Sequence, residues 1–240
     1  MKSIDPYLDK IANKKMLVVF PHPDDESVMA GGIIQRAMAW GFEVTVLTLT
    51  EGNRGKIFVN GRGRSVSEIR RQEMAEAMSR LAVMDWVMWK FDDGKLRRTK
   101  KWQERLATFI KDTQPGVVVT YDLSGVTSHP DHISASLVVL RVLRKMTGVN
   151  LLWVSFEGRM KEKIVDKRTA KYLHKPTLEL NMTIFEARRK WRAVFAHRSQ
   201  ALGGFLRSSW WLLMFFARKE WYSEAKFKAK QRYKFVPFRI

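Results

Sequence analysis

One stretch near the amino terminus constrains the fold more than any other part of the chain. Residues 16–20 read MLVVF and pass directly into the polar run PHPDDE at 21–26. A β-branched apolar run bounded by proline is typical of a buried parallel strand, and ligands of open α/β sheets bind beyond the carboxyl ends of such strands. Because adjacent carboxylates repel each other, the polar run predicts either a bound cation or two acids with separated pKa values.

A second cluster has a complementary composition. Residues 128–132 read SHPDH and follow another β-rich run, VVVTY at 117–121. Pro130 suits the first turn of a helix that continues with apolar periodicity. His129 and His132 are three residues apart, so both can reach one site from the start of that helix.

We interpret the two clusters as parts of one metal site. They contain three of the five histidines in the chain, and because the chain has no cysteine, nitrogen and oxygen must hold the metal. Two histidines and one carboxylate, with a fourth position open to water, form a known catalytic zinc site. A purely structural role remains open for each residue alone, since adjacent aspartates are also common in turns.

Strands alternate with helices along most of the chain. We predict strands at 16–20, 43–50, 85–91, 117–121 and 150–156, and helices at 26–40, from Ser65 or Ser67 to Leu81, and at 99–112, 133–147 and 183–197. This order predicts a Rossmann-like α/β fold with a mostly parallel, doubly wound sheet, because parallel neighbours need crossover connections. We expect residues 1–200 to form this domain and residues 201–240 to form a basic, aromatic extension.

The charge of the chain predicts an anionic partner or simply a solubilising surface. Lysine and arginine number 44 against 24 acidic residues, which gives a net charge of +20. The extension alternates aromatic and basic residues, so it could be core or a subunit contact in a homo-oligomer, or an anchor on an anionic membrane. Nucleic acid is a less favoured partner, because no recognised binding module accompanies the extension.

Without a secretory signal or an apolar membrane span, we expect a cytoplasmic protein, either soluble or peripheral to the membrane.

The order of the motifs resembles the PIG-L/LmbE family of zinc-dependent N-acetylglucosaminyl de-N-acetylases. The likeness extends over residues 16–200. It is carried by PHPDDE at 21–26, RRQE at 70–73, Tyr121-Asp122, HPDH at 129–132 and HRSQ at 197–200. The chain departs from many relatives at Ala82, where they have glycine, and its extension matches no motif of the family.

The resemblance implies a zinc site and a reaction. His22, Asp25 and His132 would bind zinc, and Asp24 would be the general base that acts on metal-activated water. The substrate would be an N-acetylglucosamine-containing glycoconjugate, joined to a lipid, thiol precursor, antibiotic or chitooligosaccharide. Hydrolysis of another amide, as in thiol-conjugate amidases, and a non-catalytic protein that binds lipids or polyanions remain as alternatives.

Further residues are candidates for supporting roles. We expect His129 to be cationic and to stabilise the oxyanion or protonate the leaving amine. Asp131 either accepts a hydrogen bond from His129 or a ligand histidine, or is only a favourable charge at a helix start. Arg70 is a candidate contact to a sugar or to the loop beside it, or else a solvated side chain. Asn53 and Arg54, in a glycine-rich loop that lacks any nucleotide-binding fingerprint, could bind sugar hydroxyls. The 197–200 motif either closes the site or only ends a helix.

Overall fold

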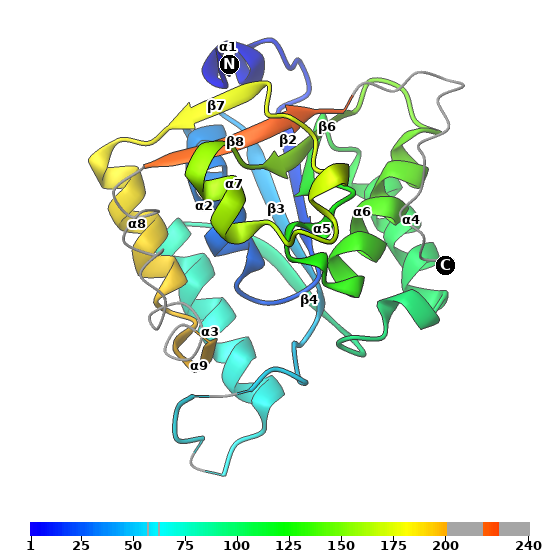
Figure 1. The fold of residues 1–240 in the computed structure, drawn as a ribbon, viewed down its shortest axis with the longest axis vertical. Helices are drawn as coiled ribbons and strands as arrows, with labels where there is room; N and C mark the ends of the chain where they lie inside the picture. The colour runs from blue at the N-terminus through cyan, green and yellow to red at the C-terminus, as the bar shows by residue number, and fades with distance from the viewer. Residues whose placement is uncertain (57, 62, 201–217, 226–240) are drawn as a thin grey trace.

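The centre of the molecule is an eight-stranded sheet with the strand order β1-β7-β8-β6-β5-β2-β3-β4 (Figure 1). The structure is a computed structural model that describes residues 1–56, 58–61, 63–200 and 218–225. The strands are β1 (Lys2–Ser3), β2 (Lys15–Phe20), β3 (Glu43–Thr50), β4 (Asp85–Phe91), β5 (Val117–Tyr121), β6 (Asn150–Ser155), β7 (Leu178–Asn181) and β8 (Lys219–Glu224). Neighbouring strands are parallel except at β8, which runs antiparallel to both β6 and β7.

Strand β2 occupies the interior of the sheet because its side chains are apolar on both faces. It pairs with β3 on one side and with β5 on the other. Val18 and Phe20 pack into the core on one face, while Leu17 and Val19 pack into the core on the opposite face. A strand buried on both faces must have helices above and below it.

Helices cover both faces of the sheet (Figure 1). Helices α2 (Asp25–Ala39), α3 (Val66–Leu81) and α8 (Ile184–Val194) contribute to the core on one face, and α4 (Lys101–Thr113) and α6 (Pro130–Leu143) to the core on the other. The shorter helices are α1 (Asp5–Asp9), α5 (Gly125–Ser128), α7 (Gly158–Ile164), α9 (Arg198–Gln200) and the 3-10 turns η1 (Leu96–Arg98) and η2 (Ala170–Tyr172). Within the described part of the chain, we find no helix with the length and apolar character that a membrane span requires.

The predicted fold class is confirmed, and each of the five predicted strands and five predicted helices has a counterpart. Capping chemistry explains where two helices begin. Ser65, rather than Ser67, caps α3 and forms a capping box with Glu68. Thr183 caps α8 in the same way with Glu186.

The predicted extension contains one strand of the sheet. Residues 219–224 form β8 between β6 and β7, so at least this segment is part of the domain and not separate from it. Neither β7 nor β8 was predicted, because polar and charged residues interrupt both strands, which read LELN and KEWYSE. The remaining parts of the extension, 201–217 and 226–240, lie outside the described residues.

A buried ion pair connects β8 to the helices. Glu220 accepts hydrogen bonds from the backbone N–H groups of Gly32 (2.7 Å) and Ile33 (2.9 Å) in α2, and from Lys190 Nζ in α8 (2.7 Å). A Cβ atom at Gly32 would lie 2.8 Å from this carboxylate. Position 32 therefore requires glycine, because any larger residue would clash with the Glu220 side chain from β8.

Candidate metal centre and active site

The two polar clusters lie side by side at the carboxyl ends of their strands. His22 follows β2, and His132 is in the first turn of α6, which follows β5. Because β2 and β5 are hydrogen-bonded parallel neighbours, their carboxyl ends meet at one edge of the sheet. The ring centroids of His22 and His132 are 5.2 Å apart, and those of His22 and His129 are 4.6 Å apart. The structure therefore brings the clusters together as the sequence predicts.

Three donor atoms converge at this edge. His22 Nδ1 lies 3.2 Å from His132 Nε2 and 3.5 Å from Asp25 Oδ2, and His132 Nε2 lies 3.7 Å from Asp25 Oδ2. Donor atoms that bind one tetrahedral zinc at its usual bond lengths are separated by about 3.3–3.6 Å. The three residues thus fit a zinc ion in both chemistry and spacing.

The groups around His132 and His22 determine which ring nitrogen of each histidine carries the proton. His132 Nδ1 lies 3.0 Å from the carbonyl oxygen of Gly125, which can only accept, so this nitrogen carries the proton and Nε2 has the lone pair. His22 Nε2 lies 3.1 Å from Asp93 Oδ1 and 3.4 Å from Asp131 Oδ2, and these carboxylates favour a proton on Nε2, so that the neutral ring has its lone pair on Nδ1. Facing lone pairs repel unless a cation or a proton lies between them. Carboxylates behind ligand histidines are also a common feature of metal sites.

The electrostatics of the cluster agree with a site for a cation. Burial opposes protonation of His22, but Asp131, Asp25 and Asp93 together raise its pKa well above the usual value. Burial would raise the pKa of Asp25, yet His132 and His22 lower it well below its usual range. Burial and His22 outweigh Asp25 and lower the pKa of His132 to about 4. At pH 7, Asp25 is therefore ionised and His132 neutral, as metal ligands must be, whereas His22 holds an additional proton that a metal ion would have to displace.

Two hydrogen bonds orient Asp25. Tyr121 donates from its hydroxyl to Oδ1 at 2.6 Å, and the backbone N–H of His22 donates to Oδ2 at 3.0 Å. The Tyr121 ring also stacks on His132, with centroids 4.1 Å apart and planes 10° apart. The last residue of β5 thus holds two of the three converging side chains.

Asp24 points to a different side from Asp25 and is more open to solvent. Its side chain is 28% exposed, against 9% for Asp25, and its Oδ2 lies 3.2 Å from Arg70 Nη2. Burial raises its pKa, Arg70 lowers it and Asp25 raises it, with a net value of about 6. A carboxylate that titrates near neutrality beside a candidate metal site is suited to proton transfer.

His129 differs from the expectation that it is cationic. Burial and the neighbouring His22 lower its pKa, so it is neutral at pH 7. Its Nδ1 accepts a hydrogen bond from the backbone N–H of Asp131 at 3.2 Å and thereby caps α6. The proton of the neutral ring is consequently on Nε2, which makes His129 a hydrogen-bond donor in this state, although its ring also lies near enough to those of His22 and His132 for the three to hold a metal ion.

Asp131 connects the candidate centre to the segment that follows β4. Its two oxygens accept the backbone N–H groups of Gly94 at 2.7 Å and Leu96 at 3.1 Å, and Oδ2 lies 3.4 Å from His22 Nε2. Its side chain is fully buried. Of the roles predicted for Asp131, these contacts favour orientation of a ligand histidine over a simple helix-start charge.

The candidate substrate residues occupy different environments. Arg70 is 3% exposed and donates to the carbonyl oxygens of Pro23 and Gly52 as well as to Asp24, so it is neither solvated nor displayed for a sugar. Asn53 and Arg54 are exposed in the loop between β3 and α3. The backbone N–H of Arg54 donates to Asp93 Oδ2 at 3.0 Å, which joins this loop to the centre.

Asp93 and Glu26 are parts of the site that the sequence analysis did not assign. Asp93 follows β4 in a turn. Burial raises the pKa of Asp93, but His22 lowers it more strongly, to about 2. Because Asp93 lies just beyond the carboxyl end of a predicted strand, its position in the sequence could have indicated that it belongs to the site. Glu26 is fully buried and lies 3.0 Å from His197 Nε2, so the 197–200 motif does reach the site.

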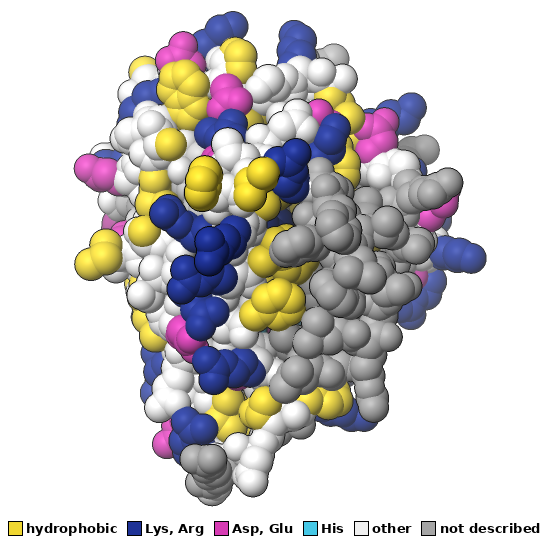
Figure 2. Space-filling view, turned by 90° about the vertical axis from the view of Figure 1, so that its left-hand side faces the viewer, with side chains coloured by type: hydrophobic (Ala, Val, Ile, Leu, Met, Phe, Trp, Pro, Cys, Tyr) yellow, Lys and Arg dark blue, Asp and Glu magenta, His cyan; other side chains and the backbone are white. Residues whose placement is uncertain are grey.

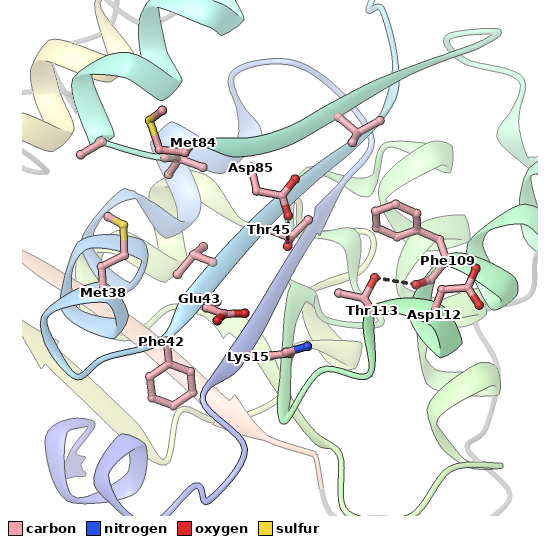
Figure 3. Close-up of a pocket in the computed structure, with 14 residues that line it drawn as sticks. Lys15, Met38, Phe42, Glu43, Thr45, Met84, Asp85, Phe109, Asp112 and Thr113 are labelled. Carbon is pink, nitrogen blue, oxygen red and sulfur yellow. Dashed lines mark hydrogen bonds between the residues drawn. The ribbon is translucent and has the colours of Figure 1, made fainter.

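A cavity of about 770 Å³ lies elsewhere, at the amino ends of β2, β3 and β4 (Figure 3). Lys15, Glu43 and Asp85, the first residues of these strands, are among its lining residues. Asp85 accepts a hydrogen bond from Thr45. The converging histidines are at the opposite ends of the strands, so this cavity is not part of the candidate centre.

Comparison with known proteins gives consistent matches. Residues 17–143 match the family model of PIG-L, described as GlcNAc-PI de-N-acetylase. A 1D-myo-inositol 2-acetamido-2-deoxy-alpha-D-glucopyranoside deacetylase of Thermobifida fusca is 29% identical over 175 residues, which cover 61% of this chain and 60% of that protein. The protein of the same name from Thermobispora bispora is 34% identical over 157 residues, covering 55% and 52%. The chain thus spans little more than half the length of these curated relatives.

Solved structures support the fold. The N,N'-diacetylchitobiose deacetylase of Pyrococcus horikoshii superposes with a TM-score of 0.70 at 21% identity, covering 89% of this chain and 84% of that one. A 4-carboxy-2-hydroxymuconate hydratase of Pseudomonas putida has a TM-score of 0.64 at 17% identity, covering 92% and 99%. Since the same fold carries both a deacetylase and a hydratase, the reaction must be argued from the site. By the family match over more than half of its length, the chain belongs to the PIG-L family.

Proposed function

We propose that this protein is a zinc-dependent amidohydrolase that removes the acetyl group from an N-acetylglucosamine-containing glycoconjugate. The observation that carries the proposal is the convergence of His22 Nδ1, His132 Nε2 and Asp25 Oδ2 within 3.2–3.7 Å of one another. The names of the curated relatives support this substrate class, since they are deacetylases of an acetamido sugar joined to inositol.

His22, Asp25 and His132 would hold the zinc ion through these three atoms. When bound, zinc supplies a Lewis acid that polarises the acetyl carbonyl and lowers the pKa of a water molecule to about 7. The chain itself keeps the ligands in the required state: Gly125 holds the proton on the far nitrogen of His132, and Tyr121 and the backbone of His22 orient Asp25.

Asp24 would act as the general base. In amide hydrolysis, the water oxygen bonds to the acyl carbon, the C–N bond breaks, and the amine departs with a proton. Asp24 can take that proton from water and return it to the amine nitrogen, because its carboxylate is partly open to solvent and titrates near pH 6. Such proton transfer contributes about 10²- to 10⁴-fold to the rate.

His129 would stabilise the oxyanion. Its Nδ1 is occupied by the N–H of Asp131, so Nε2–H is the donor that remains for the developing negative charge. A neutral donor fits the lowered pKa better than a cationic acid does, so of the two roles expected for this residue we retain stabilisation of the oxyanion. Asn53 and Arg54 remain candidates for contacts to sugar hydroxyls.

The proposal is tested by measuring zinc content and acetate release for wild type, Asp24→Asn and Asp25→Asn. The substrates are a panel of N-acetylglucosamine conjugates together with a thiol-conjugate amide. We expect near-stoichiometric zinc in wild type and Asp24→Asn, acetate release only in wild type, and loss of both zinc and turnover in Asp25→Asn. Undiminished turnover in Asp24→Asn would contradict its role as base. Wild-type protein that binds zinc but hydrolyses only the thiol-conjugate amide would instead identify the other amidase activity.

A further inference from the structure

Helix α8 has an unusual solvent-facing surface. Its inner face, which includes Ala187, Lys190, Trp191 and Val194, is buried against the rest of the domain. Its outward positions follow the same helical period. The outer face consists of Ile184, Phe185, Arg188, Arg189 and Arg192, all of which are exposed. We call these five residues the α8 outer face.

The composition of this face is not that of an ordinary solvated helix. Ile184 is 69% exposed and Phe185 is 81% exposed, although both are large apolar side chains. None of the five residues is acidic, so the three arginines have no counter-charge within the face. The acid of the first turn, Glu186, is engaged instead with Arg36, at 2.8 Å. Exposed apolar side chains beside several cations characterise surfaces that lie on a membrane.

The position of the helix extends this surface. Figure 2 shows the side of the molecule that carries α8, where Lys and Arg side chains form a column next to hydrophobic side chains. Arg80 of α3 donates to the backbone carbonyl of Arg192, and the exposed Arg198 follows the end of α8; both of these side chains also pair with Glu76 of α3. Arg80 thus lies beside the α8 outer face.

We propose that the α8 outer face docks this protein onto an anionic phospholipid membrane. Ile184 and Phe185 would enter the headgroup region, and Arg188, Arg189 and Arg192 would pair with lipid phosphates, which the arginine guanidinium can bind in bidentate fashion. The proposal concerns described residues and is separate from a role of the 201–240 extension. It does not depend on the proposed deacetylase activity.

Two other occupants fit the face less well. A second copy of the chain packed symmetrically through this face would bring the arginines of both copies together, which charge repulsion opposes. A soluble polyanion would pair with the arginines but would leave Ile184 and Phe185 in water. A membrane with anionic headgroups can both bury the two apolar side chains and pair with the three arginines.

Vesicle sedimentation of the full chain tests the proposal. The probes are phosphatidylcholine vesicles with and without phosphatidylglycerol, at low and high salt. We expect wild type to bind the anionic vesicles, with binding that weakens as salt screens the arginines. The combined variant Arg188→Glu, Arg189→Glu and Arg192→Glu should lower the partition coefficient by at least about tenfold. Ile184→Ser with Phe185→Ser should lower it at both salt concentrations.

A matched control separates this face from general charge. Lys111→Glu, Arg144→Glu and Lys145→Glu make the same change in charge at exposed positions on α4 and just beyond α6, on the other side of the sheet. We expect this control to bind at least about tenfold more strongly than the α8 variant. Equal losses in both triple variants would overturn the proposal, as would wild-type protein that fails to bind anionic vesicles. Circular dichroism verifies that each variant is folded, and a triple arginine-to-glutamine variant provides a second, milder test.

Discussion

The backbone N–H of Asp24 donates a hydrogen bond of 3.1 Å to Glu26 Oε2, and Asp24 has a φ of 112°. A non-glycine residue in this region of φ is strained and persists only where its surroundings impose the conformation. The other oxygen of Glu26 accepts from the hydroxyl of Ser27 at 2.7 Å and lies 3.0 Å from His197 Nε2. A contact from His197, which lies between α8 and α9, thus supports the backbone of the proposed base.

Glu26→Ala should consequently reduce turnover without removing the metal. We expect kcat to fall by about 10²-fold because a small displacement of a catalytic group has that order of effect. Zinc content should stay close to that of wild type, since Glu26 is not among the three converging donors. Acetate release and metal analysis measure the two quantities. Ser27→Ala, which removes only one donor to Glu26, is the control and should change kcat by less than about threefold.

Arg70→Gln should move the acid limb of the pH profile of kcat/KM to higher pH. Asp24 must be ionised to act as a base, so activity falls as the pH falls through its pKa, and the Arg70 cation lowers that pKa. Removal of the cation therefore raises the pH at which activity is lost. Arg71→Gln serves as the control, because Arg71 pairs with Glu51 at 2.8 Å and its side chain is 41% exposed. Identical pH profiles for wild type and Arg70→Gln would show that Arg70 does not control the ionisation of Asp24.

Asp131→Asn should weaken zinc binding by about 10- to 100-fold, the usual effect of altering a group that orients a ligand histidine. The substitution removes the negative charge that faces His22 Nε2 at 3.4 Å. Competition with a chelator measures the affinity. Asp92→Asn changes the same chemical group at an exposed position paired with Lys95, and its zinc affinity should equal that of wild type. Unchanged affinity in Asp131→Asn would assign Asp131 to the support of the Gly94–Leu96 backbone alone.

Arg36→Met should remove a pH-dependent part of the stability. Arg36 bonds to Asp5 at 2.7 Å and to Glu186 at 2.8 Å. Burial raises the pKa values of Asp5 and Glu186. Hydrogen bonds and charge interactions, including those with Arg36, lower these pKa values more, so both acids have pKa values below their ordinary ones. Such acids stabilise the fold above their ordinary pKa, and this stabilisation is lost as the pH falls through the lowered values. The loss in unfolding free energy should be about 2 kcal/mol near neutral pH and smaller below about pH 4.

Denaturant unfolding at a series of pH values measures this difference. Arg168→Met is the matched control, because Arg168 also pairs with an acid, Asp166, but its side chain is 80% exposed. We expect this control to remain close to wild type at every pH. A destabilisation of Arg36→Met that is the same at pH 3 and pH 7 would indicate lost packing rather than lost charge pairing.

Local sequence patterns are sufficient to predict the parallel core of this protein and the proximity of its two polar clusters. Strands such as Lys15–Phe20 and Val117–Tyr121 are apolar on both faces, which is a local property that composition reveals. The carboxyl ends of adjacent parallel strands lie at one edge of the sheet, so the sequence alone predicts that His22 and His132 lie close together.

Other features depend on contacts between residues that are distant in the sequence. Strand β8 contains charged residues and is nevertheless internal, because Glu220 finds Lys190 and the backbone of α2 as partners. The charge of His129 depends on burial and on His22, and the orientation of Arg70 depends on carbonyl groups of two loops. Local periodicity carries no information about such partners, because they are brought together only when the chain folds.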